Sequence, residues 1–374
     1  MFRINLSKKR GESSEETRKH TPLKGNSKFQ IPNSKLIGIV GMGRTGSMFF
    51  QELKDSFEVF GISKKEDIEL IKEGKVWIKK NGKEEVLKGN FLFDSEFDHS
   101  FDFLFFTVKN PVGPAISFYF KRIKEKKIKI PAVFLSQNGI EAAEEALSVL
   151  KEIFGEKSKE IPVFRISLFN PVDREEKNGR IFISYSLPVK MAIAQISGPK
   201  IDISQIFERK NFKVFFIDPK NAKNMEYSKL LLNLIGIPSA THGLSIKEGF
   251  SKKEIFKEEI LALREYKRVV KLSGGKFLNF PGYPVKFLSF LISLPISFLL
   301  PFREILAEKI EEGRRGKKKD LDEIDYYNGA VLKMAKALSA FKAPLSGAKK
   351  LKVKVPINSK ILERAKRLAS LMSR

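Results

Sequence analysis

The chain has 374 residues, of which 42% are hydrophobic and 30% charged, a composition typical of a globular protein with one or two ordinary domains. It contains no cysteine, which excludes disulfide bonds, thiolate nucleophiles, zinc ribbons and iron–sulfur clusters and fits a cytoplasmic location. The formal net charge of +26 has two interpretations: attraction to polyanions, or a composition biased towards Lys, Ile and Phe. The basic residues are scattered along the chain, which favours the second interpretation and no specific nucleic-acid partner.

Composition divides the chain into three parts. Residues 1–34 are polar and rich in Lys, Ser, Glu and Gly, so we predict a flexible basic tail rather than a secretory signal. Alternating strands and helices over residues 35–218 predict a Rossmann-type domain, and the helical periodicity of residues 219–374 predicts an all-α domain. The fold class is therefore α/β, an N-terminal doubly wound sheet followed by a helical C-terminal domain, with a cleft between them.

The predicted elements follow from apolar runs and their periodicity. In chain order they are a strand at 36–40, a helix at 45–54, a strand at 57–62, short strands at 76–78 and 85–87, a strand at 101–108, a helix at 116–127, a strand at 132–135 and a helix at 141–154. Runs at 180–186, 191–196 and 213–217 are predicted to extend or cap the same sheet. The later helices are predicted at 222–235, 252–272, 285–302, 323–340 and 359–372.

The stretch 287–302 carries no charged residue and is interrupted by Pro295 and Pro301. It is shorter than the roughly 20 apolar residues that span a bilayer, so we predict no transmembrane segment. A helix that is buried, or that lies at a subunit interface of a homodimer, is the favoured interpretation. Attachment to a membrane surface is the alternative.

The glycines Gly41, Gly43 and Gly46 form a G-x-G-x-x-G motif between the first strand and the first helix. In this position the motif is typical of dinucleotide binding, because the glycines allow a tight turn, a close approach of the pyrophosphate and close packing of helix on strand. An ordinary strand-to-helix turn is the alternative. The residues between the glycines are predicted to contact the cofactor as well: Met42, Arg44 and Thr45.

Cofactor choice depends on the end of the second strand, where a site for NAD usually has an acidic residue. The sequence there is Gly61-Ile-Ser63-Lys64-Lys65, without an acid. A hydroxyl and a cation can hold a 2′-phosphate, so Ser63 and Lys64 predict NADP (NADPH) as the cofactor.

Reduction of a ketone needs a proton donor or a cation beside the carbonyl oxygen. The histidines are His20 in the tail, His99 in a charged loop and His242. His242 alone lies in the helical half, and the sequence suggests no acidic partner for it, which favours a lysine as the donor. Lys229 and Asn233 lie four apart in an apolar helical stretch, so they share one helix face. This pair suits a catalytic site. The alternative is a lysine that extends to solvent and an asparagine that only caps the helix, which explain the same pattern.

Several motifs together resemble the ketopantoate reductase family. In chain order they are Phe106-Thr-Val-Lys109, Ser136-Gln-Asn138-Gly139, Lys229-Leu-Leu-Leu-Asn233 followed by Pro238, Pro281-Gly-Tyr-Pro284, Asp322-Glu323-Ile-Asp325 with Asn328-Gly329, and Val355-Pro356-Ile-Asn358. The resemblance spans roughly residues 36–364. It implies a Rossmann domain, a helical domain and NADPH-dependent reduction of 2-dehydropantoate (ketopantoate) to pantoate for pantothenate and coenzyme A biosynthesis.

The resemblance also assigns roles to individual residues. Lys229 corresponds to the catalytic lysine and Glu323 to the active-site glutamate. Asn233 corresponds to a substrate-binding asparagine, while Lys109 and Asn138 correspond to residues that contact cofactor and substrate on the nucleotide side. No metal ion is expected.

The chain departs from the family pattern in two places. Ile237 stands where the family usually has a second asparagine, and residues 311–320 contain no serine to bind the substrate carboxylate. Arg314 or Arg315 is a candidate replacement for that serine. Three alternatives therefore stay open: reduction of another small 2-oxo acid, a dehydrogenase of 3-hydroxy acids or sugar phosphates, and a non-catalytic NADP-binding regulator that uses its basic surface.

Overall fold

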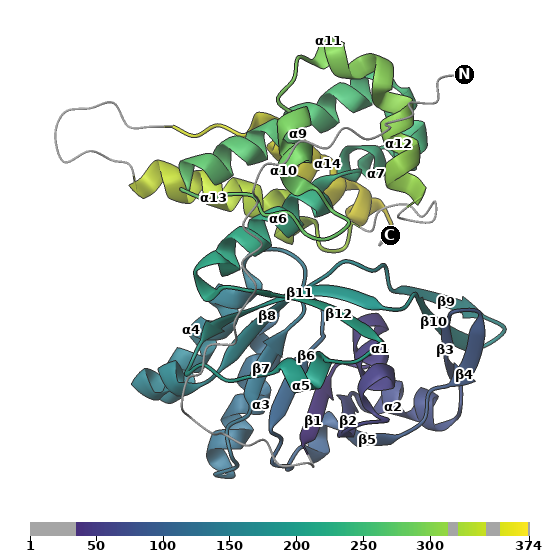
Figure 1. The fold of residues 1–374 in the computed structure, drawn as a ribbon, viewed down its shortest axis with the longest axis vertical. Coiled ribbons are helices and arrows are strands. Elements are labelled where there is room, and N and C mark those ends of the chain that lie inside the picture. The colour runs from purple at the N-terminus through teal and green to yellow at the C-terminus, as the bar shows by residue number, and fades with distance from the viewer. Residues whose placement is uncertain (1–34, 313–320, 342–351, 373–374) are drawn as a thin grey trace, which may run out of the picture. The chain divides into compact units, whose positions relative to one another are not determined.

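The computed structural model describes residues 35–312, 321–341 and 352–372 (Figure 1). The tail predicted at 1–34 and the candidates Arg314 and Arg315 lie outside these ranges. The described residues belong to one compact unit.

The main sheet of the described chain has eight strands in the order β12-β11-β8-β7-β6-β1-β2-β5. They are β1 (Leu36–Val40), β2 (Glu58–Ser63), β5 (Asn90–Phe93), β6 (Phe103–Phe106), β7 (Ala132–Leu135), β8 (Val163–Leu168), β11 (Val189–Ser197) and β12 (Phe212–Ile217). The strands from β8 to β5 are parallel, and β11 runs antiparallel to β8. Strand order reverses between β1 and β6, which opens a crevice at their carboxyl ends. The predicted doubly wound sheet is confirmed.

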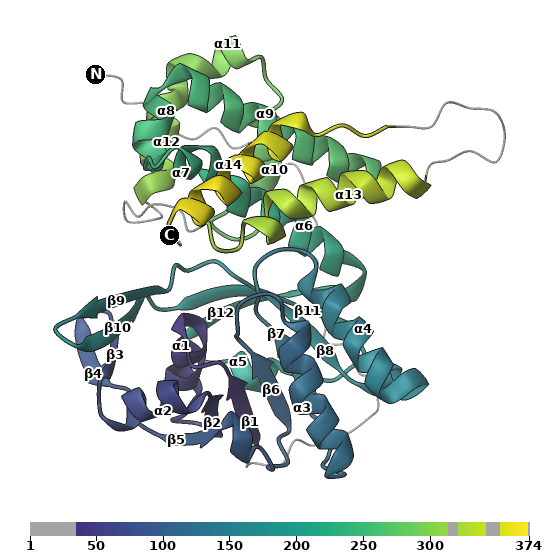
Figure 2. The same ribbon diagram turned by 180° about the vertical axis from the view of Figure 1, so that it is seen from behind.

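Helices cover both faces of this sheet because its strands are apolar on both sides. Phe103 and Phe105 of β6 pack with one group of buried residues, and Leu104 and Phe106 pack with another. The helices are α1 (Arg44–Leu53), α2 (Lys65–Lys72), α3 (Gly113–Glu125), α4 (Ala142–Phe154) and α5 (Ser204–Phe207). Figure 2 shows α3 and α4 side by side on one face; α1 and α5 pack on the other.

The run at 180–186 does not join the main sheet, so that prediction is wrong. It forms β10 (Arg180–Tyr185) in a second sheet of order β4-β3-β10-β9, with β3 (Val76–Lys80), β4 (Lys83–Val86) and β9 (Asp173–Lys177). β10 pairs in parallel with β3, which places Ile183 beside Ile78. Both side chains are buried in the core that contains α1, so burial of this alternating apolar face selects the pairing.

Strand β8 is absent from the predicted elements because Arg165 interrupts its apolar run. The side chain is nevertheless buried, and its charge is paired. β8 completes the parallel part of the sheet, and the residues that follow it reach the candidate site.

Within the described residues, only helices follow β12. They are α6 (Ala222–Leu234), α7 (Ile237–Thr241), α8 (Ile246–Ser251), α9 (Lys253–Leu272), α10 (Val285–Leu291), α11 (Ile296–Leu299), α12 (Arg303–Glu312), α13 (Asn328–Phe341) and α14 (Pro356–Met372). Helix α6 contacts β8 and β11, and it shares a core with α9 and β11. The exact domain boundary near residue 218 stays a prediction.

The single helix predicted at 285–302 is wrong: the segment breaks into α10 and α11, and Pro295 caps the second piece. Its phenylalanines are not buried, since Phe290 and Phe298 are 58% and 57% exposed. No single helix in the described part of the chain is long and apolar enough to cross a membrane. Only the pair 285–291 and 296–310 has the necessary length and composition, and it is bent by 116°.

Candidate functional site

The glycine turn lies at the carboxyl end of β1. Gly41 has a φ of +91°, which an L side chain rarely adopts, and its N–H donates to the carbonyl of Ile62. A Cβ atom on Gly46 would lie 1.9 Å from the carbonyl oxygen of Gly41, whereas one on Gly43 would meet nothing within 4 Å. Thr107 fixes the turn by donating to the Gly41 carbonyl at 2.6 Å.

Helix α1 begins directly after this turn, with Gly43 as its N-cap and no side-chain hydrogen bond to the cap from the described residues. The first amide groups of a helix have no partner inside the helix and favour an anion. The open space above Gly43 therefore fits the pyrophosphate of a dinucleotide.

Near the end of β2 the structure places an acid that was not predicted, Asp67. The Ser63 hydroxyl donates to Asp67 Oδ2 at 2.7 Å, and the Met42 amide lies 3.5 Å from the same hydroxyl. Asp67 and Arg174 both line a small hollow beside Met42 and Gly43. Asp67 was missed because it lies in the first turn of α2 rather than on the strand, and Arg174 because it comes from the second sheet.

A cavity of about 820 Å³ lies between the strand ends of the main sheet and the helices that follow. Six predicted site residues line it: Arg44, Thr45, Asn138, Lys229, Asn233 and Glu323. The other predicted cofactor residues lie outside this lining: Gly41, Met42, Gly43, Gly46, Ser63, Lys64 and Lys109. The predicted catalytic and substrate-binding residues thus converge on one cavity.

Lys229 and Asn233 lie one turn apart on α6 and both face this cavity. The Lys229 ammonium donates to the carbonyl oxygen of Leu168 at the end of β8, and it lies 5.2 Å from the centroid of the Phe169 ring. Asn233 Nδ2 lies 3.4 Å from Asn138 Oδ1, across the cavity on the loop after β7. The predicted shared face of Lys229 and Asn233 is confirmed.

Glu323 connects the same loop to the helical part of the chain. Its carboxylate accepts from Asn138 Nδ2 at 3.2 Å, from Asn110 Nδ2 at 3.3 Å and from the Tyr327 hydroxyl at 3.1 Å. Asn110 and Tyr327 were not predicted as site residues, although Asn110 directly follows the Lys109 motif. Glu323 was predicted at the start of a helix, but it precedes a short 3₁₀ turn and α13 begins only at Asn328.

Lys109 is not part of this cluster. Its ammonium pairs with Asp322 at 2.6 Å, and both side chains are largely exposed. Lys109 therefore contacts the segment that carries Glu323, but the side chain of Lys109 lies outside the cavity lining.

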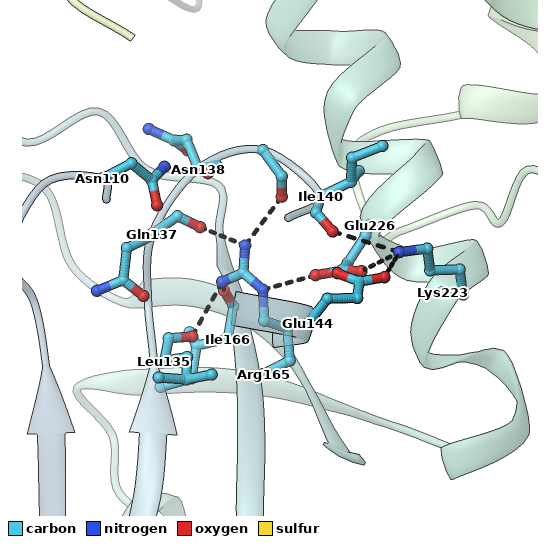
Figure 3. Close-up of polar contacts among 11 residues, drawn as sticks. Asn110, Leu135, Gln137, Asn138, Ile140, Glu144, Arg165, Ile166, Lys223 and Glu226 are labelled. Atoms are coloured by element: carbon cyan, nitrogen blue, oxygen red, sulfur yellow. Dashed lines mark hydrogen bonds and ion pairs between the residues drawn. The ribbon is translucent and has the colours of Figure 1, made fainter. Parts of the chain in front are cut away.

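A buried arginine joins the two walls of the site (Figure 3). The Arg165 guanidinium donates to the carboxylate of Glu226 on α6 at 2.8 Å. Its other hydrogen bonds go to main-chain carbonyls, at 2.5–3.0 Å, of Leu135, Ile166, Gln137 and Gly139. Two of these carbonyls flank Asn138, so one side chain holds both the Asn138 loop and the helix that carries Lys229.

Lys223 strengthens this junction from the side of α6. Its ammonium pairs with Glu144, lies 3.6 Å from Glu226 and donates to the Ile140 carbonyl at 3.3 Å. Burial lowers the pKa of Lys223, but the carboxylates of Glu226 and Glu144 outweigh burial and raise it above 10.5. The ammonium form is therefore favoured at neutral pH.

The doubly wound sheet, the glycine turn at its switch point and a lysine-bearing helix across the crevice define an architecture of nicotinamide-dependent oxidoreductases. Residues 37–168, from β1 to β8, match the family model described as "Ketopantoate reductase PanE/ApbA". The resemblance predicted from the sequence is thereby confirmed, and the matched family consists of NAD(P)-dependent oxidoreductases.

Solved structures share the fold over nearly the whole chain. A PanE/ApbA family ketopantoate reductase from Ralstonia eutropha is 16% identical with a TM-score of 0.67, covering 91% of this chain and 100% of that chain. D-mandelate dehydrogenase in complex with NADH and anilino(oxo)acetate is 15% identical with a TM-score of 0.67 and the same coverage. The 2-dehydropantoate 2-reductase from Methylococcus capsulatus is 14% identical with a TM-score of 0.61, covering 91% and 98%. No curated protein matches the sequence.

Proposed function

We propose that the protein reduces the ketone of a small 2-oxo acid to the 2-hydroxy acid with a hydride from NADPH. The observation that carries this proposal is the convergence of Lys229, Asn233, Asn138 and Glu323 on one cavity beside the glycine turn. The first substrate to test is 2-dehydropantoate, whose reduction to pantoate belongs to pantothenate and coenzyme A biosynthesis. The family match supports this choice.

The turn from Gly41 to Gly46 and the first amides of α1 suit the cofactor's pyrophosphate. A nicotinamide bound along the crevice supplies the hydride for the ketone carbon. Arg44 and Thr45 line the cavity at this end, so their side chains are placed to contact the cofactor next to the substrate.

Lys229 is the proposed proton donor. An ammonium beside the ketone oxygen polarises the carbonyl, and it gives up one proton as the oxygen becomes an alcohol. In the structure this ammonium has the Leu168 carbonyl as its acceptor, which holds it at the cavity wall. Asn233 and Asn138 present amide groups from opposite sides, and Glu323 orients Asn138.

The preference for NADPH rests on cations near the end of β2. Lys64 is the N-cap of α2 there, and Arg174 reaches the hollow beside Met42 and Gly43 from β9. Both can pair with a 2′-phosphate. Asp67 opposes this preference, because a carboxylate at this place can accept hydrogen bonds from an unphosphorylated ribose.

Ile237 favours a second candidate, a different 2-oxo acid. This residue replaces an asparagine of the family pattern and is fully buried in α7. An isoleucine offers no hydrogen bond and Ile237 does not line the cavity, so the hydrogen bond of the family's asparagine has no counterpart at this position.

The test is NADPH oxidation, followed by absorbance, with 2-dehydropantoate and a panel of 2-oxo acids. We expect turnover of at least one of these acids. NADPH binding without oxidation for any of them would contradict the proposed function, while a preference for another acid would exclude only 2-dehydropantoate as the physiological substrate.

A further inference from the structure

The cavity is divided by polarity. The end next to the glycine turn carries the amides, the ammonium and the carboxylate described above. Another part of the lining comes from α10 and α12, where five apolar side chains form the wall discussed below: Phe287, Leu288, Leu291, Leu306 and Ile310. Lys309 of α12 lines the cavity as well. A wall of this kind suits an apolar part of a ligand, because water in contact with it is released on binding.

The wall residues remain partly exposed, although Leu288, Leu306 and Ile310 also pack against the helical core. Phe287 is 57% exposed although it lines the cavity, and the leucines of α10 are only half-buried. Phe290, one turn along the same helix, is 58% exposed but lies outside the cavity lining. The two phenylalanines therefore differ in their access to the cavity and not in exposure.

Aromatic side chains connect this wall to the reacting end. The Phe169 ring lies beside the Lys229 ammonium and stacks on Tyr283 with 5.1 Å between ring centroids. The Tyr283 hydroxyl donates to the Phe169 carbonyl at 3.1 Å, which fixes the pair. Tyr283 precedes α10 and also lines the cavity, so the rings of Phe169 and Tyr283 add aromatic surface to the lining between Lys229 and α10.

We propose that the substrate is a 2-oxo acid with an extended apolar arm, which the α10–α12 wall holds while Lys229 and the asparagines hold the 2-oxo acid end. This inference rests on the proposed function and names its substrate class. A volume of about 820 Å³ is near the upper end of the range of about 300–1,000 Å³ for sites of drug-sized ligands. The nicotinamide end of the cofactor takes up part of this volume beside Arg44 and Thr45, so the space for an arm is the part that remains along α10 and α12. The five wall side chains carry no hydrogen-bonding group for the hydroxyl that ends the arm of 2-dehydropantoate, and on α12 the polar side chain that lines the cavity is Lys309.

The first experiment measures kcat/KM with NADPH for pyruvate, 2-oxobutanoate, 2-oxohexanoate, 2-oxooctanoate and 2-dehydropantoate. We expect kcat/KM to rise about fourfold for each added methylene until the wall is covered. A series that is flat, or that falls with length, would overturn the proposal. So would a clear preference for 2-dehydropantoate.

Phe287→Ser and Phe290→Ser form a matched pair on one helix. We expect Phe287→Ser to reduce the advantage of 2-oxooctanoate over 2-oxobutanoate by about three- to tenfold, mainly through KM. Phe290→Ser should leave this ratio unchanged. Thermal unfolding of both variants verifies that the exposed substitutions leave the fold intact, and equal losses in the two variants would contradict a role for the wall.

Binding separates this inference from the proposed function. The same acids are titrated by calorimetry into the complex of the wild-type protein with NADP⁺, which requires no turnover. Affinity that rises with arm length supports the wall even when no acid is reduced, in which case only the proposed reaction is wrong. Affinity that does not depend on arm length overturns the inference whether or not reduction occurs.

Discussion

Lys229 illustrates how a residue acquires a role through its neighbours. Its helix face, the Leu168 carbonyl and the Phe169 ring hold the ammonium at the cavity wall. The acceptor of this ammonium is the Leu168 carbonyl, which a substrate oxygen can replace. This arrangement makes Lys229 the residue whose loss is the sharpest test of the reaction.

We expect Lys229→Met to lower kcat by about 10²–10⁴-fold, because the transition state loses both its proton donor and a positive charge. The Kd of NADPH should stay close to that of the wild type. Steady-state kinetics and NADPH fluorescence titration measure the two effects. Lys220→Met, at an exposed lysine before α6, is the control, and equal activity in both variants would exclude Lys229 as the donor.

A substitution of Arg174 tests the preference for NADPH over NADH. We expect Arg174→Ala to raise KM for NADPH about tenfold and to change KM for NADH much less, because only the phosphorylated cofactor loses a charge-assisted hydrogen bond. Lys177→Ala, on the exposed end of the same strand, is the comparison. Equal effects on both cofactors would mean that Arg174 does not contact a 2′-phosphate.

At the scale of elements, the Arg165–Glu226 pair joins β8 to α6. Both side chains are almost completely buried, at 2% and 4% exposure. A buried charge without its partner is costly, whereas replacement of a whole buried pair by apolar residues is tolerated much better. A comparison of single and double substitutions therefore separates the contribution of the charges to stability from the contribution of the packing.

We expect Arg165→Met to lower the free energy of unfolding by about 3–5 kcal/mol, measured by urea denaturation. The double variant Arg165→Met/Glu226→Met should recover a substantial part of this loss, since no uncompensated charge is left. Arg364→Met, which breaks the more exposed pair with Glu258, should cost less. Equal losses in the single and double variants would show that the main-chain hydrogen bonds of Arg165 matter more than its charge pair.

For the whole molecule, Asp102 links stability to pH. Partial burial raises the pKa of its carboxyl, but hydrogen bonds from Lys129 and the Leu36 amide outweigh burial and hold the pKa below 3.8. A carboxyl whose pKa is lowered on folding stabilises the protein above the unfolded pKa, and this contribution is lost as pH falls through the folded pKa.

Stability should therefore decrease below about pH 4. Asp102→Asn should show a smaller decrease over this window, because it lacks the titrating group. Urea denaturation of both proteins at several pH values between neutral and strongly acidic measures the difference. Parallel curves for the two proteins would contradict the assignment to Asp102.

Much of the fold could be predicted because the relevant information is local. The apolar run of β1, the glycines of the turn and the spacing of Lys229 and Asn233 depend only on neighbouring residues. β8 was missed because Arg165 breaks its pattern, and only a carboxylate sixty-one positions later in the chain makes its burial possible. The helix at 285–302 was overextended because its apolar composition was followed through Pro295, where the structure begins a new helix.

The candidate site could be predicted in its parts but not in its connections. By itself the sequence determined the doubly wound sheet, the glycine turn, the shared face of Lys229 and Asn233 and the resemblance to ketopantoate reductases, since periodicity, turn chemistry and motif order are properties of the chain. The tertiary structure alone decided that Asp67 and Arg174 meet beside the turn, that Glu323 holds Asn138 and that α10 and α12 close the cavity with an apolar wall. These contacts join residues far apart in sequence, and they exist only because the packing of the two sheets and the helices brings these residues within reach of each other.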